Sequence, residues 1–331
     1  MRVFVTGGAG FIGSAVVRLL RARGDEVVAA VRDPARATAL AELGCRLERS
    51  DLSSVPQLQA LLTGADAAVH GAGAYRVGIR PTERPAMEDA NVGATGRVLD
   101  AAIAAGVPRI AYVSTGNVYG DTHGQIVDET YRRDPAAGFL SYYDETKYRA
   151  HLLAEARIAA GAPIVIALPG QVYGPGDHSA VGEQLRDAYR GRLRYLVLTD
   201  VGLCLGHVDD IATGVVAALD RGRLGEAYNI AGSPLRLGEA LEVAARLGGR
   251  RVPRLTVPPA VLRLMAPLAP RLPGSSGLPP NLAEVISAGD SVTYWLSSTK
   301  AARELGFSAR DVERGLRQTF GSPTTRAGGA G

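Results

Sequence analysis

Short apolar runs alternate with longer helical stretches along the first half of the chain. The short runs predict strands at Arg2–Thr6, Glu26–Val31, Arg46–Arg49, Ala67–His70, Arg109–Ser114 and Ile164–Leu168. The stretches between them predict helices at Phe11–Arg23, Ala35–Leu43, Val55–Leu62, Ala86–Ala105 and Ser141–Ala160. Alternation of this kind is typical of a parallel sheet covered on both faces, because parallel strands need a crossover to join them. The pattern therefore predicts an α/β fold with a doubly wound parallel sheet.

The rhythm changes after Pro169. A loop rich in Gly and Pro follows, and then come a predicted helix, a short strand region, a second helix and a strand. These elements are the loop Gly170–Asp177, the helices Val181–Arg190 and Asp209–Asp220, and the strand Ala227–Ile230. Further on, Pro253–Pro280 is apolar and interrupted by prolines. We expect this half to be a smaller α/β region that shapes a substrate pocket.

The change of pattern predicts a division of the chain into two regions and a tail. We assign residues 1–169 plus 204–232 to the larger domain and residues 170–203 plus 233–320 to the substrate-binding region. Residues 321–331 consist of Gly, Ser, Pro, Thr, Arg and Ala and are expected to be a disordered tail.

Composition narrows the classes of function. The chain has 331 residues, 46% of them hydrophobic, which is enough for a sizeable core. Its net charge is only +4 and the basic residues are scattered, so no nucleic-acid partner is expected. The two cysteines, Cys45 and Cys204, form neither a disulfide framework nor a zinc-ligand spacing. Since no leader and no membrane-spanning stretch is evident, we expect a cytoplasmic protein without a membrane partner.

The first predicted strand runs directly into a glycine-rich turn. Gly7, Gly10 and Gly13 follow the strand, and Phe11 and Ile12 open the next helix. This context directs backbone N–H groups toward the pyrophosphate of a dinucleotide at a helix N-terminus. A glycine-rich turn without a ligand is the alternative. The strand before it and the helix after it favour a Rossmann dinucleotide-binding domain.

The end of the second predicted strand bears on the choice of cofactor. An acidic residue there would accept hydrogen bonds from the ribose hydroxyls and repel a 2′-phosphate. Here the strand ends at Val31 and continues with Arg32, whose guanidinium can pair with the 2′-phosphate, with Arg36 as a second contact. The alternative is a surface arginine paired with Asp33. The charge favours NADP(H), and NAD(H) stays open.

Asp51 and Leu52 follow the third predicted strand. A carboxylate at this point can accept a hydrogen bond from the adenine amino group. It can equally stabilise a turn as an N-cap residue does. The sequence leaves both roles for Asp51 open.

A tyrosine and a lysine stand four residues apart within the predicted helix 141–160. Tyr143 and Lys147 therefore share one face of that helix. A free tyrosine has a pKa of about 10, and positive charge from Lys147 and an oxidised nicotinamide would favour the phenolate. Such a phenol can transfer a proton during carbonyl reduction. The alternatives are that Tyr143 is a packing aromatic and that Lys147 is a solvated charge on the helix. Together with the glycine turn, the pair predicts an NAD(P)-dependent oxidoreductase.

These motifs resemble those of the extended short-chain dehydrogenases/reductases, the NAD-dependent epimerase/dehydratase superfamily. The resemblance runs from Met1 to about Phe320. Its motifs are the Gly7/Gly10/Gly13 turn, Ser114–Gly120, Tyr143-x-x-x-Lys147, Pro169–Asp177, His207–Asp210, Tyr228–Gly232, Ser298–Ala301 and Leu305–Phe307.

The resemblance implies roles for individual residues. It makes Tyr143 the general acid/base, Lys147 the residue that holds the nicotinamide ribose, and Thr115 the hydroxyl that binds the substrate oxygen, with Ser114 as its neighbour. The residues implied to line the nicotinamide and the cofactor backbone are Pro169, Gly170, Val172, Gly71, Ala72 and Gly73. It also implies a homodimer formed through the helices near 86–105 and 141–160, and an asparagine, Asn91, that is buried and hydrogen-bonded.

Two segments separate the possible reactions within this superfamily. Its sugar-nucleotide 4,6-dehydratases carry an Asp-Glu pair after the threonine, where this chain has Gly116 and Asn117. Its sugar-nucleotide enzymes carry an Arg-Asp pair before the His-Val-Asp-Asp motif, where this chain has Leu203 and Cys204. The chain instead looks similar to the dihydroflavonol-reductase-like and 3β-hydroxysteroid-dehydrogenase-like branch, in which the apolar Leu255–Leu272 stretch would suit an apolar substrate.

Three functions remain open on the sequence. The first is NADPH-dependent reduction of a ketone or aldehyde on a small, largely apolar substrate, with Tyr143 as general acid. The second is a nucleotide-sugar epimerase or dehydratase that retains NAD(P). The third is a non-catalytic NADP(H)-sensing protein, which the intact Thr115, Tyr143 and Lys147 set disfavours.

No metal site is expected: His207 with Asp209 and Asp210 has no second histidine at ligand spacing, and a helix N-cap is favoured there.

Overall fold

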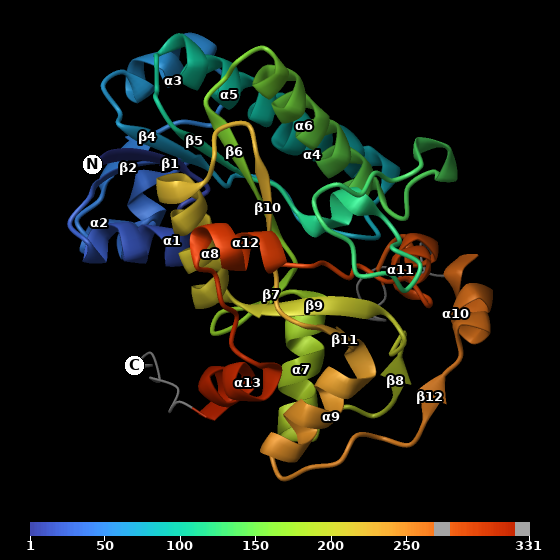
Figure 1. The fold of residues 1–331 in the computed structure, drawn as a ribbon. Coiled ribbons are helices and arrows are strands. Elements are labelled where there is room, and N and C mark those ends of the chain that lie inside the picture. The colour runs from blue at the N-terminus through green and yellow to red at the C-terminus, as the bar shows by residue number, and fades with distance from the viewer. Residues whose placement is uncertain (268–278, 322–331) are drawn as a thin grey trace.

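The computed structural model describes residues 1–267 and 279–321 (Figure 1). A seven-stranded parallel sheet forms its centre, with the strand order β10-β6-β5-β4-β1-β2-β3. Its strands are β1 (Arg2–Thr6), β2 (Glu26–Val31), β3 (Arg46–Arg49), β4 (Ala67–His70), β5 (Ile110–Val113), β6 (Ile164–Pro169) and β10 (Ala227–Ile230). The order reverses between β1 and β4, which is the switch point of a doubly wound sheet. The predicted Rossmann α/β fold is confirmed.

Helices cover both faces of this sheet (Figure 1). Val3 and Val5 of β1 face a core shared with α1 (Phe11–Ala22), α8 (Val208–Arg221) and α12 (Thr299–Leu305). Phe4 faces the opposite core, shared with α3 (Val55–Leu62), α5 (Ala94–Ala104) and α6 (Tyr142–Ala159). Alternate residues of one strand enter opposite cores because side chains alternate across a sheet. A short helix, α2 (Thr38–Glu42), follows β2.

The predicted helix 86–105 is interrupted in the structure. It consists of α4 (Arg84–Glu88), a π-helical turn (Asp89–Gly93) and α5. Asn91 lies in the π turn, and its amide accepts a hydrogen bond from Ala74 N and donates to Ala74 O and to Thr146 Oγ1. A π turn is a frequent feature of functional sites. The expectation that Asn91 is buried and hydrogen-bonded is confirmed, since it is 1% exposed.

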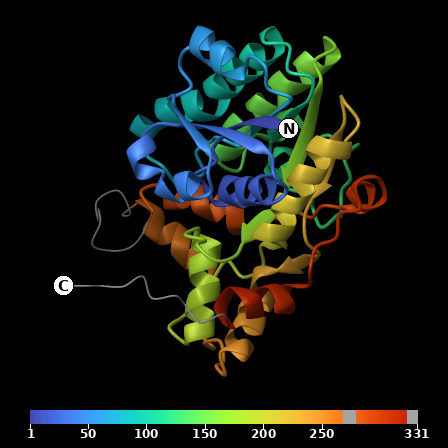
Figure 2. The same ribbon diagram turned by 90° about the vertical axis from the view of Figure 1, so that its left-hand side faces the viewer.

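The second half of the chain adds a smaller layer beside the large sheet (Figures 1 and 2). A three-stranded sheet in the order β11-β9-β7 packs against α7 (Ala180–Arg190), α9 (Leu237–Leu247) and α13 (Val312–Gly321). Its strands are β7 (Gln171–Tyr173), β9 (Gly202–His207) and β11 (Pro234–Arg236). Since β7 continues directly from β6 after Gly170, the two sheets are joined at the carboxyl end of β6.

A third group of elements lies at the side of the molecule. β8 (Leu196–Val197) pairs with β12 (Thr256–Val257), and α10 (Pro259–Met265) packs on α11 (Leu282–Gly289). The elements β12 and α10 cover most of the first part of the apolar stretch 255–272. Its residues 268–272 lie outside the described residues, as does most of the tail 321–331. Within the described part of the chain, no helix is both long and apolar enough to cross a membrane.

A buried histidine joins the two central strands. Nδ1 of His70, at the end of β4, lies 2.7 Å from Thr6 Oγ1 at the end of β1, and Nε2 lies 3.0 Å from Thr95 Oγ1 on α5. Thr95 donates its own proton to Asn91 O, so His70 Nε2 must donate to Thr95 and Nδ1 must accept from Thr6. The neutral ring thereby satisfies both nitrogens. Burial, aided by the charge of Lys147, lowers the pKa of His70 to about 3.

We predict that His70 makes the fold sensitive to acid. The unfolded chain binds a proton at His70 below pH ~6.5, whereas the folded chain does not until about pH 3, so protonation favours unfolding between these values. The free energy of unfolding should fall by up to about 1.4 kcal/mol per pH unit in this window through His70 alone. In His70→Gln this part of the slope should vanish. Denaturant titrations at several pH values measure it, with the exposed His123→Gln as control; equal slopes in wild type and His70→Gln would contradict the prediction.

Candidate active site

The residues predicted to bind the cofactor lie at one edge of the large sheet. Most of them lie at or just after the carboxyl end of a parallel strand, and these ends lie on both sides of the switch point. Gly7 follows β1, Arg32 follows β2, Asp51 follows β3 by one residue, Gly71 follows β4, and Ser114 follows β5. Pro169 ends β6, Gly170 links it to β7, and Val172 lies within β7.

The glycine turn leaves no room for side chains. Gly10 N donates to Gly7 O at 2.9 Å, and Gly7 has a φ of +73°. A Cβ on Gly13 would lie 2.1 Å from Gly7 O, and a Cβ on Gly7 would lie 2.5 Å from the carbonyl carbon of Gly71. Helix α1 begins at Phe11 without a side-chain cap and without an acidic residue in its first turn. Its free N–H groups and the bare backbone in front of them fit the pyrophosphate of a dinucleotide.

The loop after β4 is held against this turn. Ala72 N donates to Thr6 Oγ1 at 3.4 Å, the same hydroxyl that contacts His70. A Cβ on Gly73 would lie 3.0 Å from Asn91 Oδ1. The Thr6 and His70 pair therefore positions both cofactor loops. Sequence reasoning did not identify this pair, although each residue directly precedes a predicted glycine loop.

The two arginines after β2 are exposed. Asp33 does not pair with Arg32; its carboxylate accepts from Ala35 N and caps the short 3-10 turn Pro34–Arg36. In the described residues Arg32 forms no ion pair, so its guanidinium is free to meet an anion at the strand end.

Asp51 stabilises a turn. Its Oδ1 accepts from Ser53 N at 3.0 Å and from Ser53 Oγ at 2.6 Å, and these bonds lower the pKa of Asp51. Leu52 has a φ of +65°, unusual for leucine, and its carbonyl accepts from Arg97 Nε at 2.7 Å. Asp51 therefore acts in a turn through Oδ1. Both bonds leave Oδ2 unused, so the predicted hydrogen bond from an adenine amino group stays a prediction.

Tyr143 and Lys147 lie one turn apart near the start of α6, whose N-cap is Ser141. Both are buried, at 8% and 6% exposure. Thr115, which lies just after β5, is close enough to Tyr143 to lower the pKa of its phenol. The ammonium of Lys147 donates to Val113 O at 3.3 Å and to Tyr112 Oη at 3.4 Å. The three residues predicted from the sequence are therefore brought together.

Burial governs the acidity of Tyr143. It raises the pKa of the phenol, the nearby ionisable side chains of Tyr75 and Asp144 raise it further, and the Thr115 hydroxyl lowers it. The ammonium of Lys147 is directed to Val113 O and Tyr112 Oη, and its effect on the phenol together with a bound nicotinamide stays a prediction. A phenol in this environment is protonated near neutral pH, as a proton donor requires.

An apolar loop covers Tyr143. The ring of Tyr75 meets the ring of Tyr143 edge-on at 4.8 Å, and Ile79 and Met87 complete the buried cluster. The loop is anchored at Gly78, whose N–H donates to Glu284 Oε2 at 3.1 Å while its carbonyl accepts from Asn281 N at 3.0 Å. Glu284 Oε1 also accepts from Tyr142 N, so one carboxylate ties α11, the loop and the start of α6 together.

Asn117 and Ser114 make contacts that the sequence did not reveal. Asn117 Nδ2 donates to Asp144 Oδ1 at 2.9 Å, and Asn117 Oδ1 accepts from the Thr115 hydroxyl at 3.2 Å. Ser114 Oγ lies 3.1 Å from His151 Nδ1. Only the spacing of Asp144 and His151 along α6 could have indicated that they face the strand end.

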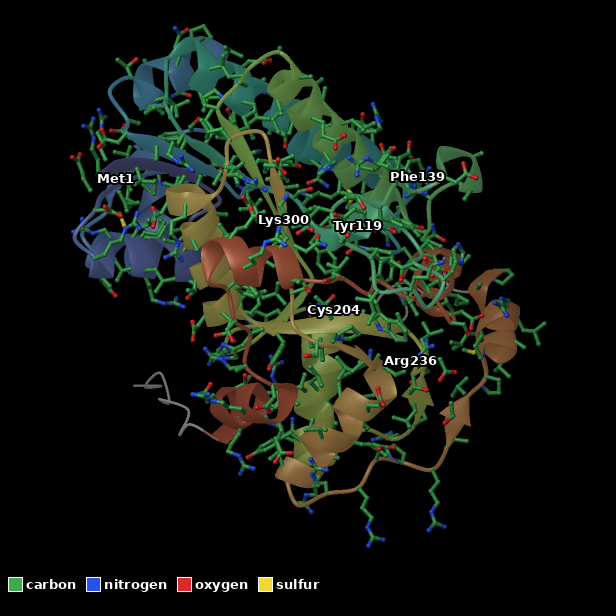
Figure 3. All side chains as sticks on the ribbon, viewed as in Figure 1. Met1, Tyr119, Phe139, Cys204, Arg236 and Lys300 are labelled. Atoms are coloured by element: carbon green, nitrogen blue, oxygen red, sulfur yellow. The ribbon has the colours of Figure 1, made fainter. Side chains whose placement is uncertain are left out.

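The positions that differ from sugar-nucleotide enzymes are packed. A Cβ on Gly116 would lie 2.4 Å from Leu296 Cδ1, so an acid at position 116 would require the Leu296 side chain to shift. Leu203 and Cys204 are buried in β9, where Leu203 packs with the smaller layer and Cys204 with a core of the large sheet. Figure 3 labels Cys204 on this strand.

His207 is a helix cap. Its Nδ1 accepts from Asp209 N at 3.3 Å, at the start of α8. Among the described residues, no group of three or more His, Cys, Asp or Glu side chains could hold a metal ion. The N-cap role predicted for this residue is confirmed.

Comparisons with known proteins agree with this geometry. The model of the NAD dependent epimerase/dehydratase family matches residues 3–231. The 4-hydroxy-2-methyl-3-oxo-4-farnesyl-3,4-dihydroquinoline-1-oxide ketoreductase of Stigmatella aurantiaca is 32% identical, over 94% of this chain and 92% of its own. The 2-alkyl-3-oxoalkanoate reductase of Stenotrophomonas maltophilia is 30% identical, over 96% of this chain and 98% of its own.

A solved structure shares the fold over nearly the whole chain. It is a double mutant of DesIV, the dTDP-glucose 4,6-dehydratase of Streptomyces venezuelae, with NAD and DAU bound. It is 26% identical, covers 96% of this chain and 95% of its own, and has a TM-score of 0.77. The protein is thus an oxidoreductase-type enzyme that uses a pyridine nucleotide, and the chain belongs to the NAD dependent epimerase/dehydratase family of extended short-chain dehydrogenases/reductases.

Proposed function

We propose that the protein reduces a ketone or aldehyde on a small, largely apolar substrate with NADPH. The observation that carries this proposal is that Tyr143 and Lys147 lie buried one turn apart in α6, with Lys147 bound to Val113 O at the end of β5, two residues before Thr115. The apolar cluster of Ile79 and Met87 around Tyr143 supports an apolar substrate. So do the names of the two relatives, a ketoreductase and an oxoalkanoate reductase.

The cofactor would be held by the residues at the strand ends. Gly7, Gly10, Phe11, Ile12 and Gly13 would bind its pyrophosphate, and Arg32 with Arg36 would bind a 2′-phosphate. The remaining contacts would come from Asp51, Leu52, Gly71, Ala72, Gly73, Ser114, Tyr143, Lys147, Pro169, Gly170 and Val172. When bound, the nicotinamide would supply a hydride to the substrate carbon.

The side chains would then perform the proton chemistry. Thr115 would hold the carbonyl oxygen, and Tyr143 would donate its proton to that oxygen as negative charge develops there. Burial keeps the phenol protonated, which suits reduction better than oxidation. Lys147 would hold the nicotinamide ribose, with its ammonium positioned by Val113 O and Tyr112 Oη.

A retained-cofactor epimerase or dehydratase is the second candidate, because the fold is similar to that of DesIV. Two features disfavour it. An acid at position 116 would require the buried Leu296 side chain to shift, and Leu203 and Cys204 offer no guanidinium to a diphosphate.

We predict that the purified protein consumes NADPH with a carbonyl substrate and that Tyr143→Phe lowers this rate by about 10²–10⁴. The measurement is NADPH absorbance across a panel of ketones and aldehydes. Tyr142→Phe serves as the control, because Tyr142 Oη donates to Glu88 and not to the active site. Interconversion of a nucleotide sugar without net NADPH loss would support the epimerase alternative, and near-normal turnover in Tyr143→Phe would exclude Tyr143 as the acid.

Arg32 should decide the preference for NADPH over NADH. A charge-assisted hydrogen bond to the 2′-phosphate is worth roughly 1.5–3 kcal/mol, or about ten- to a hundredfold in affinity. Arg32→Ala should weaken NADPH binding by that factor and leave NADH binding nearly unchanged. Fluorescence titration with NADPH and NADH measures the two affinities. The control is Arg46→Ala, because Arg46 begins β3 and lies at the end of that strand away from the proposed cofactor site. Equal affinity of the wild type for the two cofactors would refute the preference.

We further propose that α5 and α6 form the interface of a homodimer. Ile103 on α5 and Leu152 on α6 are 37% and 42% exposed, and Arg157 pairs with Asp100 to join the two helices. Light scattering at micromolar concentration should give the mass of a dimer, and Leu152→Arg should shift it toward the monomer. The matched control is Leu264→Arg on α10, which exposes 79% of its surface. A monomeric wild type would overturn this proposal.

A further inference from the structure

One side of the molecule concentrates positive charge. Residues 188–199 contain three arginines and residues 243–267 contain five, and neither segment contains an acidic residue. The whole chain has 37 basic and 33 acidic residues, so acidic residues balance the basic ones elsewhere. The two basic segments are therefore a local feature, and the proposed function does not use it.

The two segments lie side by side in the structure (Figure 1). β8 in the first segment pairs in parallel with β12 in the second, and Leu196 N donates to Leu255 O at 2.8 Å. Further back along the chain, the side chain of Arg250 lies against Gly191, where an added Cβ would be 3.0 Å from Arg250 Cδ. The arginines that precede the two strands are therefore brought to the same surface.

Six of these eight arginines are exposed and form no ion pair within residues 1–267 and 279–321. The other two pair with Glu313 and Asp290. Several guanidinium groups without acidic partners create a positive potential that attracts anions. The six form what we call the arginine cluster: Arg190, Arg192, Arg194, Arg250, Arg251 and Arg254.

Two large apolar or aromatic side chains are exposed within the same surface. Leu255 precedes β12 and is 62% exposed, and Tyr195 precedes β8 and is 51% exposed. Each of them directly follows an arginine of the cluster. A single exposed apolar residue is ordinary on a protein surface, but a group of neighbouring ones marks an interaction site.

Helix α10 extends this apolar surface. Val261, Leu264 and Met265 are 42%, 79% and 39% exposed, and their spacing of three and four residues places them on one face of the helix. The opposite face is held by the protein, because Leu262 is buried in a cluster with Leu282 and Ile286 of α11. The exposed face of α10 is thus fixed in position and open to solvent.

Arginines interspersed with exposed apolar side chains fit the surface of an anionic lipid membrane. The guanidinium groups are attracted to anionic headgroups, and the apolar side chains leave water at the boundary with the acyl chains. Nucleic acid also attracts arginine, but its phosphates and base edges are polar and gain little from exposed leucine and valine. The combination therefore favours lipid.

We propose that the arginine cluster, Tyr195, Leu255 and the exposed face of α10 bind the surface of an anionic membrane. The expectation from the sequence that the protein has no membrane partner concerned spanning stretches and does not bear on a surface contact. Because α10 packs on α11, whose Glu284 anchors the loop over Tyr143, the contact suits an enzyme with an apolar substrate. The membrane contact itself does not rest on the proposed function.

Sedimentation with lipid vesicles tests the proposal. The full chain should bind vesicles of phosphatidylcholine and phosphatidylglycerol in equal parts and not vesicles of phosphatidylcholine alone, and added salt should weaken the binding. The triple variant Arg250→Ser/Arg251→Ser/Arg254→Ser should bind on the order of a hundredfold more weakly, since each basic residue near an anionic surface contributes about fivefold. Leu264→Ser should lower the affinity by about tenfold.

Two matched variants control for the loss of charge and of apolar surface. Arg303→Ser/Arg314→Ser/Arg317→Ser removes three exposed arginines from α12 and α13. Leu224→Ser removes a leucine that is 49% exposed in the loop before β10. Both variants should bind the mixed vesicles as the wild type does.

A fluorescent label distinguishes a membrane from other partners. Both native cysteines, Cys45 and Cys204, are buried, so a dye can be attached selectively to Val261→Cys. Its emission should shift to the blue with the mixed vesicles and not with duplex DNA, because only the membrane offers the dye an apolar environment.

Four results would overturn the proposal: no binding to the mixed vesicles, wild-type binding in the arginine triple variant, wild-type binding in Leu264→Ser, or no blue shift. Wild-type binding in Leu264→Ser together with tight binding of duplex DNA would indicate a nucleic-acid partner instead. An oligomer that Leu264→Ser dissociates would indicate that a second copy of the chain covers α10. Since no substrate is present, none of these results depends on whether the protein reduces a carbonyl.

Discussion

The close approach of two backbone loops at the centre of the sheet constrains the rest of the structure. β1 and β4 are neighbours with Thr6 opposite His70, and directly beyond them Gly7 and Gly71 come so close that a Cβ on Gly7 would lie 2.5 Å from the Gly71 carbonyl carbon. The buried Thr6–His70 hydrogen bond holds the strand ends together beneath this contact. Because neither loop carries a side chain at the contact, the backbone of both is available to a dinucleotide.

Burial determines the chemistry of the site more than charge does. Tyr143, Lys147 and Asp144 all lie near the start of α6 and are largely shielded from water. Burial raises the pKa values of both the phenol and the carboxyl, while Lys147 is occupied by Val113 O and Tyr112 Oη. The site therefore combines a protonated phenol with hydroxyl and amide groups held by neighbours, an arrangement suited to donating a proton. The loop anchored by Glu284 maintains this dry environment.

Much of the fold could be predicted because its signals are local. The strands at 67–70 and 227–230 and the helix at 55–62 have the predicted limits, since each depends on a short apolar run or on a cap such as Ser54. The helix at 86–105 could not be predicted in detail. Its π turn is stabilised by hydrogen bonds from Asn91 to Ala74 and Thr146, which are distant along the chain. The small sheet of β7, β9 and β11 was likewise missed in detail, because its short strands are defined by pairing with one another.

The same distinction applies to the site. The sequence by itself determined the glycine turn, the Tyr143 and Lys147 pair and the Thr115 hydroxyl, because each is a residue type at a fixed spacing within one element. Only the tertiary structure decided where the Lys147 ammonium points, that Asp144 meets Asn117, and that His70 is neutral between Thr6 and Thr95. These contacts join residues 25 or more positions apart, and their hydrogen-bond directions and pKa values depend on burial. Burial arises only when the elements pack, so no local pattern in the sequence encodes it.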